Sequence, residues 1–338
     1  MKKEVKQNKI NKPVSATFIV LCVILFVYAA YIIFMLLWGL NTSLKSKGEF
    51  GHLENYMGFP NLNRDAEESS FEAFFHLANY KTIIENFRYI NSFTYYRGSQ
   101  AVSRQTRTLF GVLVGAQNSA DLKYAYFPDM MLNTIIYVGG AAIVSSVIPA
   151  LTAYLTAKYD FKLSGIIFVL YTLMMCMPIV GNQPAQLAFL QRTGLYDTMI
   201  GIILQWASGA GLYYFVFYAY FKSVPETYRE AASIDGAGEA TIMFKIYFPL
   251  AVKMVSTVFL LMFVSLWNDY QTPMIFLPTK PTLAFGVYYF SSMSGDPKFY
   301  NDPTKIAANM ILALPILVLF IIFKNKLMGD ISLGGIKE

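Results

Sequence analysis

A run of residues without a single charge, from Ala16 to Leu40, is the feature that most restricts how this chain can fold. As a helix rising ~1.5 Å per residue, the run is long enough to cross the ~30 Å hydrocarbon core of a bilayer. It also exceeds the apolar core of a secretory signal peptide, which is only ~7–15 residues long. Lysines are frequent in residues 1–15, just before the run. We therefore expect a retained first transmembrane helix over 16–40, with residues 1–15 in the cytoplasm.

Further apolar runs predict a polytopic membrane protein that is all-α, with about six transmembrane helices. The composition agrees, because 55% of the residues are hydrophobic and only 14% are charged, whereas soluble domains carry about a quarter charged residues. Lysines and arginines gather between the second and third runs and between the fourth and fifth, which places both termini in the cytoplasm. The five further runs are 130–157, 163–180, 198–221, 255–277 and 306–323.

The regions outside the predicted spans suggest the remaining organisation. Residues 41–129 are too polar to span and would form an extracytoplasmic segment. Apolar residues at helical spacing predict an amphipathic helix over 69–90. The rest of the segment would be a small lobe packed on the membrane domain, or a dock for a partner protein. Residues 130–323 would form the membrane core, and residues 324–338 a cytoplasmic tail.

The cytoplasmic segment between the fourth and fifth runs predicts a helix–turn–helix over 223–248. Ser223 with Glu226 matches the capping box S-x-x-E, which predicts that a helix begins at the next residue. Asp235-Gly236 would end that helix, because glycine readily adopts the left-handed conformation found after helix ends. A second short helix is expected over 239–247 and would stop at Pro249. Such a hairpin could dock a partner protein or rest on lipid headgroups.

Three strings of residues resemble ABC importer permeases of the binding-protein-dependent carbohydrate (maltose-type) family. Glu230-Ala231-Ala232-Ser233-Ile234-Asp235-Gly236-Ala237, followed by Phe244, Ile246 and Pro249-Leu250, resembles the EAA loop of these permeases. Ser265-Leu266-Trp267-Asn268-Asp269-Tyr270 is similar to the W-N-D-F/Y segment of their fifth helix, and Gly334-Gly335-Ile336-Lys337 to the end of the second permease of the pair. The resemblance covers roughly 16–40 and 130–338, whereas 91–129 has no counterpart and Lys253 replaces a frequent second proline.

This resemblance implies the type I ABC importer permease architecture in the bacterial cytoplasmic membrane. The implied partners are a second permease in a heterodimer, two copies of an ATP-binding subunit, an extracytoplasmic solute-binding protein and a sugar, with an oligosaccharide preferred. ATP and Mg²⁺ would bind the partner ATPase, since this chain has no G-x-x-x-x-G-K-[ST] and is not expected to be an enzyme. Coupling to the ATPase is assigned by resemblance to Glu230, Ala231, Ala232, Asp235, Gly236 and Ala237. The tail residues Gly334, Gly335 and Lys337 would contact the ATPase or form a frayed terminus.

Polar residues within the apolar runs are candidates for a substrate path. An ionisable group at bilayer depth costs about 2.5–3.5 kcal/mol on insertion scales, which favours a position facing a cavity or another helix. Asp269 could line the path or bond a neighbouring helix. Trp267, Asn268, Tyr270 and Gln205 are further candidates for the path.

Other functional classes are weakly supported by the residues. His52 and His76 are the only histidines and are too isolated for a metal site. The formal charge of +6 is explained by cytoplasmic loops, so no nucleic-acid partner is expected. The alternative function is a stand-alone secondary transporter or channel. Such a protein would handle coupling ions with charges inside the membrane, where Asp269 is the one strong candidate.

Overall fold

The computed structural model describes most of the chain as helices that belong to two compact units. One unit lies within residues 1–79 and 301–310, and the other within 80–300 and 311–338. The described residues are 16–51, 57–60, 77–86, 88–90, 93–97, 100–104, 124–176, 181–208, 211–292 and 301–330.

The first unit contains α1 (Ala16–Ser43), α2 (Lys47–Gly51) and the first turns of α15 (Asp302–Asp330). Most of α1 is exposed, as expected for an uncharged helix surrounded by lipid. The Asn79 side-chain amide donates to the backbone oxygens of Ser43 and Lys45, both at 2.8 Å. Its oxygen accepts a 3.3 Å hydrogen bond from the Thr304 hydroxyl. Asn79 thus connects the end of α1 to the start of α15.

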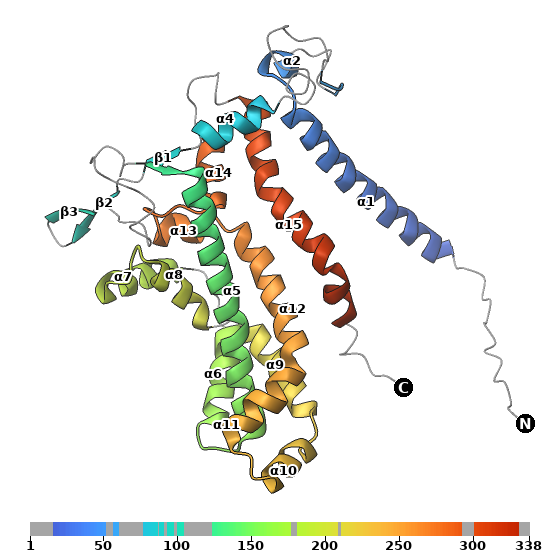
Figure 1. Ribbon diagram of the computed structural model, residues 1–338, viewed down its shortest axis with the longest axis vertical. Helices are drawn as coiled ribbons and strands as arrows, with labels where there is room; N and C mark the ends of the chain where they lie inside the picture. The colour runs from blue at the N-terminus through green and yellow to red at the C-terminus, as the bar shows by residue number, and fades with distance from the viewer. Residues whose placement is uncertain are drawn as a thin grey trace, which may run out of the picture. The chain divides into compact units, whose positions relative to one another are not determined.

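The second unit is built around α5 (Phe127–Lys158), which packs against α9 (Gly211–Ser223) and α12 (Phe248–Trp267) (Figure 1). Small buried residues on α5 allow these helices to approach closely; they are Ala141, Ala142, Ser145, Ser146, Ala150 and Ala153. This unit also contains most of α4 (Ala78–Asn86), α15 from residue 311 onward, and further helices. These are α6 (Ser164–Cys176), α7 (Gln183–Thr193), α8 (Met199–Gln205), α10 (Thr227–Ile234), α13 (Gln271–Phe276) and α14 (Leu283–Ser292), and the short α11 (Glu239–Ile242) precedes α12.

The fifth predicted span, 255–277, was wrong at its C-terminal end, because α12 ends at Trp267 and α13 begins at Gln271. Four helices of the described residues are long and apolar enough to cross a membrane, and they confirm the first, second and sixth predicted spans and the fifth as far as Trp267. They are Ala16–Ser43, Phe127–Lys158, Glu239–Trp267 and Asp302–Phe323. The third predicted span contains α6, which is shorter, and residues 177–180 lie outside the described part. The all-α fold class is confirmed.

The prediction of one continuous helix over 198–221 was wrong. Thr198 accepts a 3.0 Å hydrogen bond from the Gly201 amide and caps α8, which ends at Gln205. A 3₁₀ turn follows over Trp206–Ser208, and helical structure resumes in α9 at Gly211. The sequence Ser-Gly-Ala-Gly at this break explains it, because glycine weakens a helix by about 0.5–1 kcal/mol relative to alanine.

The predicted amphipathic helix over 69–90 was wrong at its C-terminal end. The described helix is α4 (Ala78–Asn86), and β1 (Arg88–Ile90) follows it and pairs antiparallel with β4 (Tyr124–Tyr126). A second antiparallel pair joins β2 (Phe93–Arg97) to β3 (Gln100–Arg104). Helical periodicity could not reveal β1, because its partner strand is distant in the sequence. The earlier part of the predicted helix, 69–76, lies outside the described residues.

The predicted stop at Pro249 was also wrong, because α11 continues into α12. A π-helical turn, Met243–Tyr247, joins them, and the Phe248 N–H bonds to the Met243 oxygen. Pro249 occupies the first turn of α12, where a missing N–H is tolerated. The second helix of the predicted hairpin and the fifth span are therefore one element.

Candidate functional site

The turn between α10 and α11 is present where Asp235-Gly236 predicted it. The Ala237 N–H bonds to the Ala232 oxygen at 2.9 Å, and the Gly236 N–H bonds to the Ser233 oxygen at 3.1 Å. These two bonds form a Schellman motif, which requires a left-handed residue after the helix. Gly236 supplies it with φ of 77°. Gly236 therefore sets the angle between the two helices, which together form the α10–α11 hairpin (Thr227–Ile242).

The capping box predicted at the start of this hairpin was wrong. Ser223 is the last residue of α9, and its hydroxyl donates a 2.7 Å hydrogen bond back to the Tyr220 oxygen. Helix α10 begins at Thr227 instead, after Val224 and Pro225. Glu226 is drawn away from the Ser223 amide because its carboxylate pairs with Lys158. Local spacing could not foresee a partner so far away in the chain.

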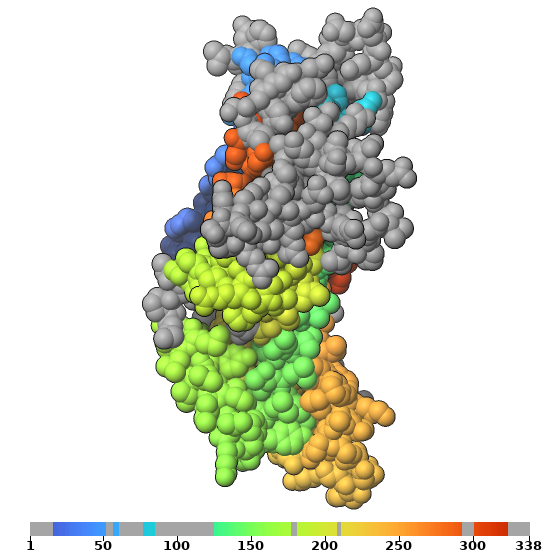
Figure 2. Space-filling model, turned by 90° about the vertical axis from the view of Figure 1, so that its left-hand side faces the viewer, coloured from blue at the N-terminus to red at the C-terminus, as the bar shows by residue number. Residues whose placement is uncertain are grey.

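One face of the α10–α11 hairpin is open, and it includes most of the residues assigned to coupling by resemblance. Glu230, Ala231, Asp235 and Gly236 are exposed, whereas Ala232 is buried and Ala237 is half-buried. Ile234 is 86% exposed. A groove of about 600 Å³ beside it is lined by Glu226, Arg229, Glu230, Ser233 and Ile234. The hairpin forms the gold lower end of the second unit in Figure 2.

The base of the hairpin is bound to the end of α5 by a buried lysine. The Lys158 side chain is only 2% exposed, and its ammonium lies 2.8 Å from a Glu226 carboxylate oxygen. The same ammonium donates a 2.6 Å hydrogen bond to the Val224 oxygen. It also lies 5.2 Å from the centre of the Tyr247 ring. Its charge is thus compensated by an anion, a carbonyl group and an aromatic face.

Tyr159, the next residue, connects both hairpin helices. The Arg229 guanidinium of α10 lies 5.0 Å from the centre of its ring. Its hydroxyl donates to the carboxylate of Glu239 on α11, and Arg229 pairs with the same carboxylate at 3.5 Å. Burial, together with the hydrogen bond to Glu239, raises the pKa of Tyr159 well above its ordinary value. The hydroxyl therefore remains a donor even at pH values at which an ordinary tyrosine ionises.

Among the residues predicted for a substrate path, Trp267 and Asn268 make contacts within the protein. Trp267 is 4% exposed, and its indole N–H donates a 3.0 Å hydrogen bond to the Leu312 oxygen of α15. Its ring stacks on Phe263. Asn268 is exposed and donates to the Val264 oxygen at 3.2 Å. Trp267 therefore packs in the core.

Asp269 bonds two other elements of the unit. One carboxylate oxygen accepts a 3.0 Å hydrogen bond from the Tyr137 hydroxyl of α5. The other accepts the Thr272 N–H at 3.1 Å, in the first turn of α13. The neighbouring Tyr270 stacks on Tyr288, with ring centres 4.3 Å apart. These contacts match the alternative in which Asp269 bonds neighbouring helices.

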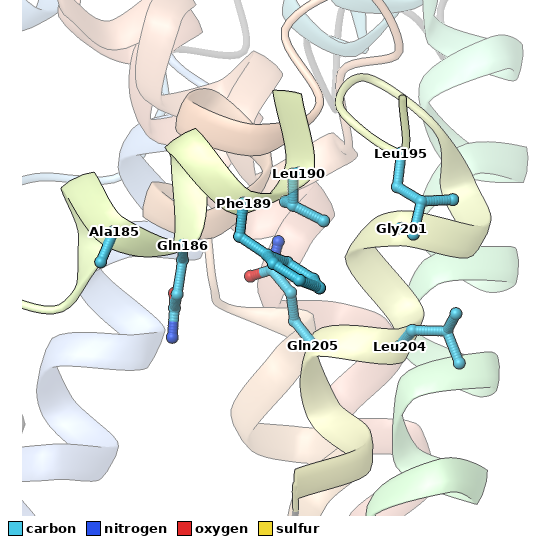
Figure 3. A pocket seen from close by; sticks show the side chains of 8 residues that line it. All are labelled: Ala185, Gln186, Phe189, Leu190, Leu195, Gly201, Leu204 and Gln205. Carbon is cyan, nitrogen blue, oxygen red and sulfur yellow. The ribbon is translucent and has the colours of Figure 1, made fainter. Parts of the chain in front are cut away.

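Gln205 lines a cavity of about 530 Å³ between α7 and α8. Figure 3 shows its side chain and the Phe189 ring directed toward each other. The lining is otherwise mostly apolar: Ala185, Gln186, Leu190, Leu195, Gly201 and Leu204. The predicted path residues 267–270 are not among the residues that line it. The tail residues Gly334, Gly335 and Lys337 lie outside the described part of the chain.

Sequence reasoning missed a second buried polar contact, between Asp197 and Thr279. Asp197 is 4% exposed and adopts a positive φ of 60°. Its carboxylate accepts the Thr279 N–H at 3.2 Å and the Thr279 hydroxyl. The Lys280 ammonium donates to its backbone oxygen at 3.1 Å. Aspartate tolerates the left-handed region better than most residues, and this offered a weak local signal of a turn before α8.

Comparison with known proteins identifies related chains. Residues 145–325 match the family described as "Binding-protein-dependent transport system inner membrane component". The melibiose/raffinose/stachyose import permease protein MelC of Bacillus subtilis is 29% identical over 216 residues, which cover 62% of this chain and 76% of MelC. The diacetylchitobiose uptake system permease protein NgcG of Streptomyces coelicolor is 28% identical, over 60% of this chain and 68% of NgcG.

A third relative and a solved structure agree. The trehalose transport system permease protein SugB of Mycobacterium tuberculosis is 25% identical, over 62% of this chain and 77% of SugB. A chain from the crystal structure of a bacterial ABC transporter involved in the import of the acidic polysaccharide alginate superposes with a TM-score of 0.67 and 18% identity. The match covers 91% of this chain and 95% of that one. At this identity the likeness concerns the fold.

Proposed function

The chain belongs to the family of binding-protein-dependent transport system inner membrane components, and from this premise we propose that it is one of two permeases in an ATP-driven oligosaccharide importer. As a member of this family it is a permease of the bacterial cytoplasmic membrane rather than an enzyme. In the proposed complex it pairs with a second permease. Two ATP-binding subunits, carrying ATP and Mg²⁺, and an extracytoplasmic solute-binding protein complete the assembly.

The open face of the α10–α11 hairpin is the observation that carries this proposal. It lies inside the matched region, and its turn at Gly236 has a defined backbone geometry. Ile234 and the groove beside it offer an apolar contact bordered by the charges of Glu230 and Arg229. A cytoplasmic ATPase could bind this face and displace the hairpin when it closes on ATP. The spans would then alternate between inward and outward access.

The names of the relatives support an oligosaccharide as the substrate. MelC, NgcG and SugB are named for melibiose, raffinose, stachyose, diacetylchitobiose and trehalose. These solutes differ in linkage and length, but all of them are small, uncharged glycosides. The proposal therefore names the class of solute and not one member of it.

Co-purification from native membranes tests the assembly. We expect a C-terminally tagged chain, extracted in mild detergent, to bring down a second permease and an ATPase that carries a P-loop. Gly236→Pro should lose the ATPase, because proline cannot adopt φ of 77°. Gly236→Asn is the matched control and should retain it, since asparagine visits the left-handed region. A chain that purifies alone or as a homo-oligomer would instead favour a stand-alone secondary transporter or channel.

Uptake by cells that lack the chromosomal copy tests the substrate class. We expect expression of the chain to restore the uptake of at least one of raffinose, trehalose and diacetylchitobiose. Restoration of glycerol-phosphate or monosaccharide uptake, with none of these three transported, would contradict the oligosaccharide assignment. That result would leave the importer assignment intact.

A further inference from the structure

Two consecutive residues at the end of α5, Lys158 and Tyr159, contact both ends of the α10–α11 hairpin. We call this pair the α5 corner. On the side where the chain enters the hairpin, Lys158 binds the Val224 oxygen and the Glu226 carboxylate. On the side where the chain leaves it, the Lys158 ammonium faces the Tyr247 ring. One buried charge therefore joins the entry and the exit of the hairpin to the same helix end.

Tyr159 repeats this arrangement one residue later. Its ring lies under Arg229 of α10, and its hydroxyl binds Glu239 of α11. Arg229 also bonds to the Lys158 backbone oxygen at 3.4 Å, and it pairs with Glu239. The two hairpin helices are thus tied to each other and to the α5 corner by two charged side chains, Arg229 and Glu239, and the phenol of Tyr159.

The α5 corner is itself supported by the core of the second unit. Tyr154, one turn earlier on α5, is fully buried. Its ring meets the edges of Tyr159 and Phe221, and lies 5.1 Å from Tyr247. Its hydroxyl is 3.2 Å from that of Tyr159. Moving the hairpin away from α5 would also separate the buried Lys158 ammonium from Val224 and Glu226. Leaving a buried charge without its partners costs free energy.

We propose that Lys158 and Tyr159 are positioning residues that lock the α10–α11 hairpin to α5, so that any displacement imposed on the hairpin moves α5 with it as one body. This inference rests on the proposed function for the source of the displacement, the partner ATPase. The lock itself follows from the buried contacts. It differs from docking, because neither residue lies on the open face of the hairpin.

Distances between two spin labels test the lock in the complete complex. Cys22 and Cys176 are first replaced by alanine, and labels are attached at Leu155→Cys on α5 and Thr241→Cys on α11. Both positions are exposed. The complex is purified with its ATPase, and the distance distribution is measured without nucleotide and with ATP plus vanadate. We expect one narrow distribution with the same mean in both states.

Substitutions at the α5 corner should make the distance distribution depend on the nucleotide. With Lys158→Gln, and separately with Tyr159→Phe, we expect ATP plus vanadate to shift or broaden the distribution. Lys158→Arg should restore the narrow distribution, because it keeps the charge. Lys162→Gln, an exposed lysine in the same loop, is the matched control and should behave as the unchanged chain. Tyr159→Phe keeps the ring and so remains informative should Lys158→Gln fail to fold.

The outcomes separate the two proposals. A shift in the unchanged chain on adding ATP plus vanadate, with the ATPase present, would overturn the lock alone. Identical distributions in Lys158→Gln, Tyr159→Phe and the unchanged chain would also overturn it, as would loss of the ATPase from both variants, which would reveal a docking role. Mass spectrometry of the unchanged sample tests the proposed function independently. Absence of any ATPase there would overturn the proposed function and, with it, the displacement that the lock is proposed to transmit to α5.

Discussion

The Tyr137 hydroxyl donates a 3.0 Å hydrogen bond to Asp269, and so joins the middle of the central helix α5 to the segment that follows α12. The second carboxylate oxygen of Asp269 is occupied by the Thr272 N–H. Both oxygens therefore serve the protein itself. The sequence left two roles open for Asp269, a substrate contact and a bond between helices. These contacts favour the bond between helices.

We expect Asp269→Ala to lower the stability of the purified protein by about 1–3 kcal/mol, because it leaves the Tyr137 hydroxyl without this acceptor. Thermal unfolding in detergent would measure the loss. Asn268→Ala is the neighbouring control and should have a smaller effect, since Asn268 is exposed and, among the described residues, its side chain donates to the Val264 oxygen of its own helix. If both variants were equally stable and only Asp269→Ala lost uptake, the result would support a substrate contact by Asp269.

Trp267→Phe should reduce stability by about 0.5–1.5 kcal/mol, since it removes the hydrogen bond to the Leu312 oxygen while keeping an aromatic ring beside Phe263. The order in which competing sugars inhibit uptake should not change. A changed order of competing sugars would show that Trp267 contacts the substrate. Tyr270→Phe serves as a comparison, because it preserves the stack with Tyr288 and loses only a hydroxyl.

Gly201→Ala should be destabilising by about 1–3 kcal/mol, as expected for overpacking. A methyl group at this position would lie 2.1 Å from the Leu195 backbone oxygen, which cannot move aside like a flexible side chain. Gly139→Ala on α5 is the matched control, because, apart from the adjacent backbone of α5 itself, no atom of the described residues lies within 4 Å of the added carbon. It should be neutral or slightly stabilising. Thermal unfolding would compare the stabilities of the two variants. A larger loss for Gly139→Ala than for Gly201→Ala would contradict the close packing at α8.

Thr279→Val should weaken the connection between the turn before α8 and the segment after α13. It removes the hydroxyl donor to Asp197 but keeps the backbone N–H bond. Because the Asp197 carboxylate is buried, we expect a loss of about 1–3 kcal/mol. Thr279→Ser should retain most of the stability. Hydrogen exchange at residues 195–198 would locate the effect, and unchanged protection there in Thr279→Val would rule the connection out.

The fold class was predictable because lipid imposes long uncharged helices whose length can be read from the sequence. Pairing over long distances was not predictable in this way. Glu226 matched a local cap, yet it pairs with Lys158, and Pro249 matched a stop, yet a π turn carries the helix past it. The break after Gln205 followed from glycines inside an apolar run, where hydropathy alone indicated continuity.

In the candidate site, too, local features were predictable and contacts between distant residues were not. The turn at Gly236 is a local backbone property and was predicted from two residues. The roles of Trp267 and Asp269 depend on Leu312 and Tyr137, which no local pattern connects to them. Lys158 was counted only among the charges between the second and third runs, and Tyr159 was not singled out, because their partners lie on helices more distant in the chain.

The joining of α11 to α12 gives the second unit an uninterrupted rod, Glu239–Trp267, which at ~1.5 Å per residue is about 43 Å long. This is longer than the ~30 Å hydrocarbon core, so its two ends reach opposite surfaces of the bilayer. A rod fixed to α5 that turns about an axis inside the membrane carries its ends in opposite directions. In the proposed importer, opening at one surface and closing at the other would then require no separate signals, because they are two ends of a single rotation.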